Sequence, residues 1–254
     1  MMRRGVYLMF LLTWFRGRLM LLGLGLGFTW LLNPRANPWD FLLAATAMKM
    51  LALIFVPMFL FIVGRNLKGS WETLVGSRMG HAVSWWWADV WSLGLSAVMV
   101  SLSLGLLTVL VALFTRGWSW HWGGYAQSQH LQGISRTIPW LWGLEDLGLM
   151  TLGFWAMGVL YHVLSLWWRT PWIAWVAVVV GNMLPLVFAG TAARHIIWWI
   201  PGPQFSLGAH FSVIGVMPPL WSLGYALTLL AGMSATGMFL ATAYPWDAIP
   251  HGSL

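Results

Sequence analysis

The chain contains no cysteine and very little charge. Its 254 residues include 13 Lys or Arg and 6 Asp or Glu, so that only 7% are charged while 59% are hydrophobic. Soluble domains carry about 25% charged residues, and the low value here excludes an ordinary soluble fold. The absence of cysteine excludes disulfide frameworks, thiolate metal sites and cysteine nucleophiles. The composition therefore predicts a single domain that lies in a lipid bilayer.

The chain also lacks any polar stretch long enough to form a separate soluble core. A membrane-spanning helix needs about 20 mostly apolar residues, and six segments meet or approach this length, at about residues 19–32, 41–63, 90–115, 144–166, 171–190 and 222–244. The first 18 residues, with arginines at both ends of a short apolar run, predict an interfacial elbow helix. We therefore expect an all-α polytopic membrane protein with six transmembrane helices, its borders marked by the 22 tryptophans.

The distribution of basic residues predicts the orientation. With both termini cytoplasmic, eight Lys or Arg residues fall on the inner side and four on the outer side, as the positive-inside rule requires. The basic residues are scattered singly rather than gathered in a patch, which argues against nucleic acid as a partner. We expect a multi-pass protein of the cell membrane whose basic side chains meet anionic lipid headgroups.

Residues 64–84 form the one sizeable polar link on the cytoplasmic side. Apolar residues recur there at helical spacing, at Leu67, Trp71, Leu74, Val75, Met79 and Ala82. This spacing predicts an amphipathic helix on the membrane surface, with Glu72, Thr73 and Ser77 toward water. Glycines at 69, 76 and 80 lie opposite the apolar face, where they either permit close approach by a partner or merely loosen a loop.

The order of these elements resembles the membrane subunits of ABC exporters of the ABC-2 permease type. In that family the segment after span two has an arginine, a glycine and then a Thr-Leu-Glu-Leu-like run that ends in a small residue and arginine. The matching residues here are Arg65, Gly69, Trp71, Glu72, Thr73, Leu74, Ser77 and Arg78. The turn Ser165–Pro171 is similar to the family's short turn between spans four and five.

The resemblance implies a permease subunit that works as a homodimer or heterodimer with a separate ABC ATPase. The cytoplasmic helix would dock into that ATPase, which would bind ATP and Mg. The sequence agrees in one respect, because no G-x-x-x-x-G-K-[ST] motif occurs and neither Lys49 nor Lys68 follows a glycine. We expect no catalytic, cofactor or metal site in this chain and therefore no enzyme activity of its own. The apolar spans favour an amphiphilic or hydrophobic cargo such as a peptide, lipid or drug, with a cation as the other possibility.

Small residues four apart predict where helices approach closely in lipid. Gly23 and Gly27 form such a pair in span one, and Ala177 and Gly181 form one in span five. We interpret both pairs as a possible dimer seam, although small residues at this spacing also occur by chance.

A few ionisable residues fall inside the spans and predict a pathway. Lys49 lies within span two, and it either faces a cavity, with Glu145 or Asp146 as its partner, or extends to the headgroups. His162 is the one histidine deep in a span, and no second histidine at helical spacing supports a metal site. Asp89 is expected to pair with Arg169 or Arg65.

Two alternatives remain open at this level. The outer link at residues 191–221, broken by prolines, is expected to form re-entrant or surface helices that either cap the pathway or pack on the bundle. The other function class is a non-transport membrane protein, either an assembly factor or an embedded enzyme that uses His162 with Glu145 or Asp146.

Overall fold

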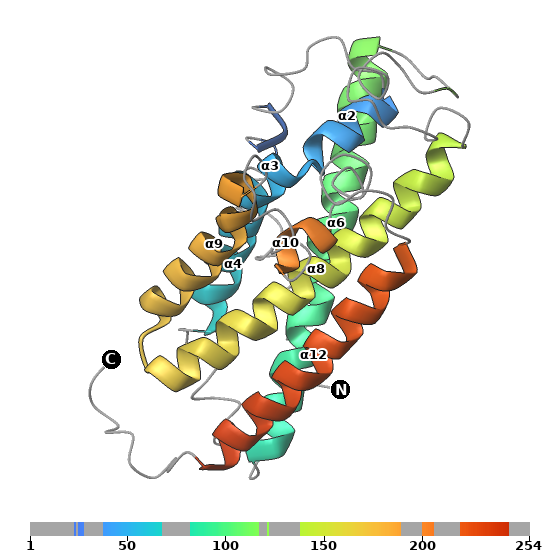
Figure 1. Ribbon diagram of the computed structural model, residues 1–254. Coiled ribbons are helices and arrows are strands. Elements are labelled where there is room, and N and C mark those ends of the chain that lie inside the picture. The colour runs from blue at the N-terminus through green and yellow to red at the C-terminus, as the bar shows by residue number, and fades with distance from the viewer. Residues whose placement is uncertain are drawn as a thin grey trace, which may run out of the picture.

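The computed structural model describes an all-helical bundle (Figure 1). It describes residues 23, 25–27, 38–67, 82–116, 121, 138–188, 200–205 and 219–243, and no strand occurs among them. The helices are α2 (Pro38–Ala45), α3 (Met48–Met50), the π-helix η1 (Leu51–Phe55), α4 (Val56–Leu67), α6 (Ala82–Arg116), α8 (Pro139–Trp168), α9 (Pro171–Phe188), α10 (Pro201–Gln204) and α12 (Pro219–Ala243).

Five of the predicted spans are present among the described residues. Four single helices are long and apolar enough to cross a bilayer, at Trp86–Val111, Pro139–Trp168, Pro171–Phe188 and Trp221–Ala243. A bent pair, Trp39–Ala45 and Met48–Gly64, provides a fifth crossing when it is counted as one span. Their ends agree with the predicted ends to within a few residues, which confirms a multi-span helical membrane protein.

Several predicted elements lie outside the described residues. They are the elbow helix at residues 1–18, the centre of the cytoplasmic link at 68–81, and the outer segment at 191–221 apart from residues 200–205 and 219–221. Of the predicted first span at 19–32, four residues are described. All four of these elements stay predictions.

The span predicted at 41–63 is bent by 45° between α2 and α3, a feature that was not predicted from the sequence. At the bend Ala47 has an extended backbone, with φ −56° and ψ 143°. The Thr46 hydroxyl donates to the carbonyl of Leu42 at 2.9 Å, and such bonds from a threonine to the preceding turn favour helix bending. Just beyond, Pro57 lacks the N–H that would bond to Leu53, and the π-helix η1 accommodates this loss.

Contacts along α8 fix the direction of its neighbours. Gly105 of α6 packs closely on Leu147 of α8, and Gly94 of α6 packs closely on Trp155 of α8. Residue numbers in α6 therefore decrease in the direction in which residue numbers in α8 increase. These two helices are therefore antiparallel. On the other side Leu42 lies by Gly143, and Phe59 lies by Gly158, so the broken span runs parallel to α8.

The remaining long helices continue this alternation. The chain reverses at Arg169, which has a left-handed φ of 54°, and α9 starts at Pro171, as the predicted tight turn requires. At the far end of α12, Gly237 lies against Trp86, which is in the first turns of α6. We refer to the end of the bundle at which α8 stops as the Arg169 end, and to the opposite end as the Pro139 end.

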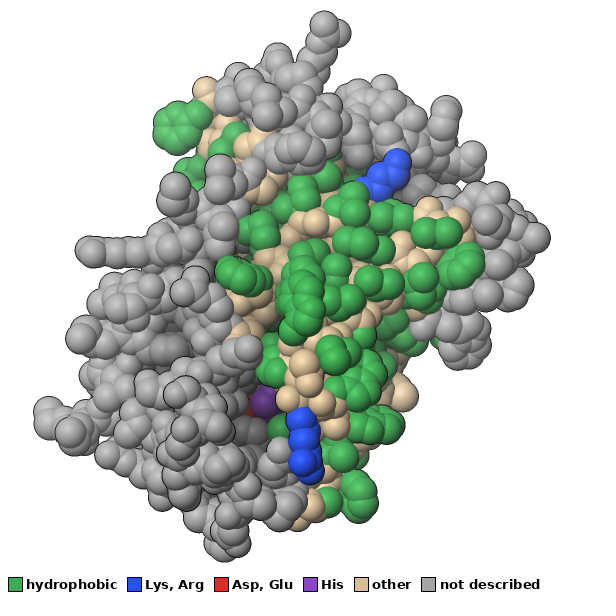
Figure 2. Space-filling model, turned by 90° about the vertical axis from the view of Figure 1, so that its left-hand side faces the viewer, with side chains coloured by type: hydrophobic (Ala, Val, Ile, Leu, Met, Phe, Trp, Pro, Cys, Tyr) green, Lys and Arg blue, Asp and Glu red, His purple; other side chains and the backbone are tan. Residues whose placement is uncertain are grey.

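The surface is apolar, as expected for helices that face lipid. Exposed residues follow α6 at helical spacing, at Trp91, Leu95, Val98, Leu102, Leu106, Leu110 and Phe114. Figure 2 shows the side on which α9 and α4 lie, where apolar side chains cover most of the described surface and basic side chains lie near its upper and lower ends. Exposed tryptophans at 167, 168 and 172 mark the Arg169 end, as an interfacial belt would.

Candidate functional site

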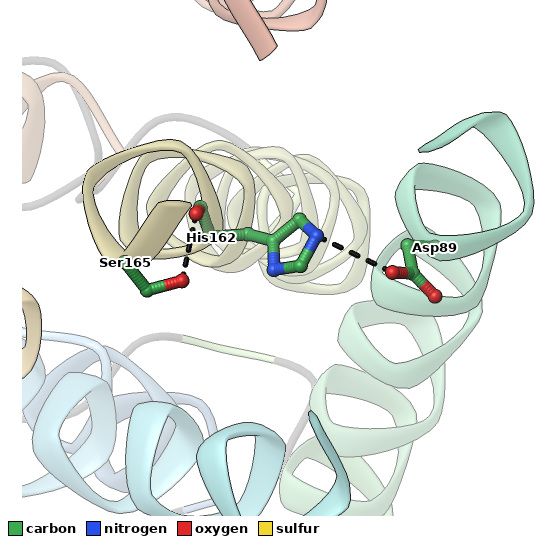
Figure 3. Close-up of polar contacts among 3 residues, drawn as sticks. All are labelled: Asp89, His162 and Ser165. Carbon is green, nitrogen blue, oxygen red and sulfur yellow. Dashed lines mark hydrogen bonds and ion pairs between the residues drawn. The ribbon is translucent and has the colours of Figure 1, made fainter. Parts of the chain in front are cut away.

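The most unusual feature of the described bundle is a pair of ionisable side chains buried between α6 and α8. His162 Nε2 lies 3.3 Å from Asp89 Oδ2, and the two side chains are 2% and 9% exposed. Figure 3 shows the imidazole ring pointing from α8 toward the carboxylate on α6. The atoms are at ion-pair distance, but their mutual orientation completes no hydrogen bond, so the attraction between them is mainly electrostatic. We call these two residues the Asp89–His162 pair.

Antiparallel packing brings the pair together and keeps its register. The indole Nε1 of Trp155 donates to the Val90 carbonyl at 2.9 Å, one residue beyond Asp89. Trp155 also fills the space at Gly94, where a Cβ would lie 2.9 Å from its ring. Together these contacts hold α6 and α8 at one axial position, so that His162 and Asp89 face each other.

Trp86 closes the pair on a third side. Its ring stacks on the His162 imidazole with centroids 5.1 Å apart and an interplanar angle of 12°, and it is completely buried. Trp86 precedes Asp89 by three residues, so both lie on one face of α6. A Cβ at Gly237 of α12 would overlap this ring, and glycine is therefore the residue that lets α12 pack here.

The last turns of α8 support His162. The Ser165 hydroxyl donates to the His162 carbonyl at 2.7 Å (Figure 3). Tyr161, the residue before His162, packs its hydroxyl against Gly64 of α4. A Cβ added at Gly64 would lie 2.7 Å from that hydroxyl oxygen. His162 is six residues from the end of α8, or about 9 Å along the axis. The pair therefore lies below the tryptophan belt of the Arg169 end, within the apolar zone.

Of the two expected partners of Asp89, Arg169 is not the residue at ion-pair distance, and Arg65 stays a prediction. Arg169 is exposed at the end of α8, and the ion-pair contact of Asp89 is with His162. The side chain of Arg65, the other expected partner, is outside the described residues. Sequence reasoning placed Asp89 at the mouth of span three because the span was taken to start at residue 90, whereas the apolar helix already includes Trp86.

The other predicted pathway residues lie far from this pair. Asp146 is buried and Glu145 half-buried near the start of α8, about 24 Å from His162 along the helix axis. An embedded enzyme that uses His162 with either carboxylate is therefore not supported. Lys49 is exposed on α3, which favours extension of its ammonium to the headgroups. A pathway role for Lys49, Glu145 and Asp146 stays a prediction.

Predicted partner-binding residues are only partly described. Of the proposed ATPase contacts, Arg65 lies in α4, and Gly69, Trp71, Glu72, Thr73, Leu74, Ser77 and Arg78 are outside the described residues. In the proposed dimer seam, Gly23 and Gly27 are exposed, and a Cβ at either would meet no atom of the described residues within 4 Å, whereas Gly25 between them faces Phe55. Ala177 and Gly181 are half-buried, and the space at Gly181 is open.

A second buried polar site, which sequence reasoning missed, lies at Asn182 of α9. Its Oδ1 atom is buried and accepts no hydrogen bond. It borders a cavity of about 10 Å³, which is room for about one water molecule. The other lining residues are apolar, namely Leu51, Val56, Met150, Gly153, Phe154, Met157 and Phe205. An asparagine inside an otherwise apolar helix is the feature of the sequence that could have indicated this site.

The described residues contain no cluster of three or more metal-ligating side chains. No protein-family model matches the chain, and it matches none of the curated proteins or solved structures.

Proposed function

We propose that the chain is the permease subunit of an ATP-driven ABC exporter and that it moves an amphiphilic or hydrophobic cargo. ATP and Mg would be bound by a separate ATPase, and two permease subunits would form the pathway in the cell membrane. The chain would itself hold no nucleotide. Both termini would lie in the cytoplasm, on the same side as the Arg169 end.

The observation that carries this proposal is where the polar link at residues 68–81 begins and ends. Before it, α4 reaches the Arg169 end, where Gly64 packs on Tyr161. After it, α6 starts at the same end, where Trp86 stacks on His162. A partner docked on this link would therefore pull on the two helices that flank the Asp89–His162 pair. The tight α8–α9 turn also lies at this end.

Such a pull supports an alternating-access mechanism. The contacts described above between α6 and α8 are apolar packing, the indole hydrogen bond of Trp155 and the Asp89–His162 pair, and the broken span packs on α8 through apolar side chains. Sliding or tilting of these helices exposes mostly apolar surface. An amphiphilic or hydrophobic cargo makes more favourable contacts with such a surface than a hydrophilic solute does. The bend between α2 and α3 offers a point at which the span can change its angle.

Charge inserted into the link tests the proposal. We expect Glu72→Arg and Gly76→Glu to weaken co-purification of the ATPase about 30-fold or more, because a charge placed in a docked interface costs at least about 2 kcal/mol. Gly124→Glu, the same change in the link between α6 and α8, is the matched control and should leave association intact. The measurement is the amount of ATPase retained after mild detergent purification, with cargo-stimulated ATP hydrolysis in vesicles as the second readout.

The proposal fails if the wild-type chain purifies without any ATPase while remaining folded. It also fails if both link variants retain the ATPase and full stimulation of hydrolysis. Those outcomes would favour a non-transport role such as an assembly factor.

A further inference from the structure

The Asp89–His162 pair has a composition that suits one small ligand, the proton. A carboxylate and an imidazole within 3.3 Å together offer one shared site for a proton at physiological pH, since imidazole is the side chain that changes charge there. An ionised residue inside the bilayer costs several kcal/mol unless it is paired or wet, and such residues commonly mark proton or substrate routes. The position inside the apolar zone is therefore difficult to explain by packing alone.

We propose that Asp89 and His162 form a proton-binding site whose proton is exchanged as α6, α8 and α12 change their packing. With the proton bound, the carboxylate faces an imidazolium and the pair is neutral overall. Release of the proton to water leaves a carboxylate beside a neutral imidazole, with a net charge of −1. The two states differ in net charge inside an apolar surrounding, so any change in hydration or packing around the pair alters how strongly the proton is held.

Trp86 provides a group that distinguishes the two states. Its ring lies nearly parallel to the imidazole at 5.1 Å, within the distance at which an aromatic face attracts a cation. Gly237 allows α12 to pack directly against Trp86. Movement of α12 or α6 therefore shifts the Trp86 ring and changes the affinity of the pair for the proton.

Few other ionisable groups face the pair from the described parts of the surrounding helices. On α8 they are Tyr161, packed toward α4, and Arg169, exposed at the helix end. The neighbouring α12 carries Tyr225, which lies 12 residues before Gly237 and thus about 18 Å away along the axis, and α9 carries no ionisable residue. Arg65 belongs to α4, and the nearest acidic residues of α8, Glu145 and Asp146, lie at the Pro139 end.

The proton site itself stands on this geometry, and only its coupling to transport rests on the proposed function. In the proposed exporter, the coupling link pulls on α4 and α6, and α6 carries both Asp89 and Trp86. Proton uptake and release would then accompany each cycle, and the external pH would bias which packing of the bundle is favoured.

Infrared titration of the reconstituted full-length chain tests the site without any ATPase. We expect isotope-labelled imidazole bands of the wild type to change with pH as the imidazolium releases its proton, and His162→Gln to remove that change. In Asp89→Asn the imidazole loses the carboxylate that faces it in both states, so the pH at which the His162 bands change should move by about one unit or more. The matched controls are Asp146→Asn, a second buried aspartate, and His121→Gln, an exposed histidine. Neither control should move the pH at which the His162 bands change.

Trp86→Phe keeps an aromatic ring of weaker cation affinity and provides a variant that preserves the packing volume better than an aliphatic one. We expect the pH at which the isotope-labelled His162 bands change to move in this variant, by less than it moves in Asp89→Asn. The proposal is overturned if the His162 bands do not change with pH, or if Asp89→Asn does not move the pH at which they change. Because the chain is measured alone, either failure leaves the proposed export function to its own test.

Discussion

Gly237 is the residue on which closure of the Asp89–His162 pair depends. The Trp86 ring occupies the place that a Cβ of residue 237 would take, and that ring is completely buried against His162. A side chain at 237 must therefore displace either α12 or the indole. Gly232, on the same helix, is exposed and has open space around it, so the two glycines differ in environment while sharing one helix.

We expect Gly237→Ala to destabilise the protein by about 1–3 kcal/mol, because the added methyl group overpacks a filled contact. Gly232→Ala should be neutral or stabilising by up to about 1 kcal/mol, since alanine favours a helix more than glycine does. Thermal unfolding of both variants in detergent checks this difference. An equal midpoint for the two variants would show that the Trp86 contact does not limit the packing of α12.

The candidate site was only partly predictable from the residues themselves. His162 was singled out as a histidine deep in a span, and Asp89 as an acid near a span border. Their contact could not be predicted, because 72 residues separate them in the sequence and both helices are apolar on all sides, so the sequence shows no periodic face that points inward. Gly237 gave no signal, since glycine is common in membrane helices.

At the level of elements, the short α10 and the residue after it pack against α8 and α12. Phe205, the residue after α10, packs on Gly153 of α8. A Cβ added at Gly153 would lie 2.6 Å from the Cβ of Phe205. The Ser222 hydroxyl of α12 donates to Gln204 Oε1 at 2.9 Å, and this bond is buried. Phe205 also lines the cavity beside Asn182, so the docking of α10 closes that cavity.

Gly153→Ala should therefore loosen α10 as well as destabilise the fold by about 1–3 kcal/mol. The readout is the rate at which maleimide modifies a cysteine placed at Ile200, next to α10, and we expect this rate to rise several-fold. Gly148→Ala is the matched control on the same helix, because Gly148 is exposed with nothing near it. A labelling rate that Gly153→Ala leaves unchanged would contradict the role of Phe205 in docking α10.

Hydropathy predicted the position of the described spans but not their shape. Length and apolar composition are averages over about 20 residues. They set the ends of α9 and α12 well, whereas α6 begins at Ala82, before the predicted start at 90, and α8 at Pro139, before the predicted start at 144. The bend near Thr46 and the π-helix before Pro57 depend on single hydrogen bonds. Pro57 could have indicated an irregularity in this helix. Which backbone hydrogen bond is lost there depends on the contacts that surround the helix.

For the molecule as a whole, the alternating spans place the links on two opposite sides. The α8–α9 turn and the start of α6 share the Arg169 end, whereas His121 belongs to the link between α6 and α8 at the other end. The distribution of basic residues predicts that the Arg169 end faces the cytoplasm.

The absence of native cysteine allows this orientation to be tested with single-cysteine variants. A membrane-impermeant maleimide should modify His121→Cys in intact cells, and it should modify Thr170→Cys only after the membrane is opened. We expect at least about a tenfold difference between intact and opened cells at position 170, and little difference at 121, because the bilayer blocks the reagent. The reverse pattern would invert the orientation, and equal labelling at both positions in intact cells would contradict a spanning α8.

The burial of Asp89 also has a consequence for biosynthesis. During translation His162 is made 73 residues after Asp89 (162 − 89), and at about 5–20 residues per second this delay is roughly 4–15 s. Until α8 inserts, the carboxylate in α6 lacks the imidazole that it meets in the finished bundle. The two-residue connection between α8 and α9 then leaves so little chain that these helices enter the bilayer as a hairpin. Insertion of this hairpin is thus the step that completes the site, and a chain truncated before α8 would expose an unpaired acid to the machinery that removes incomplete membrane proteins.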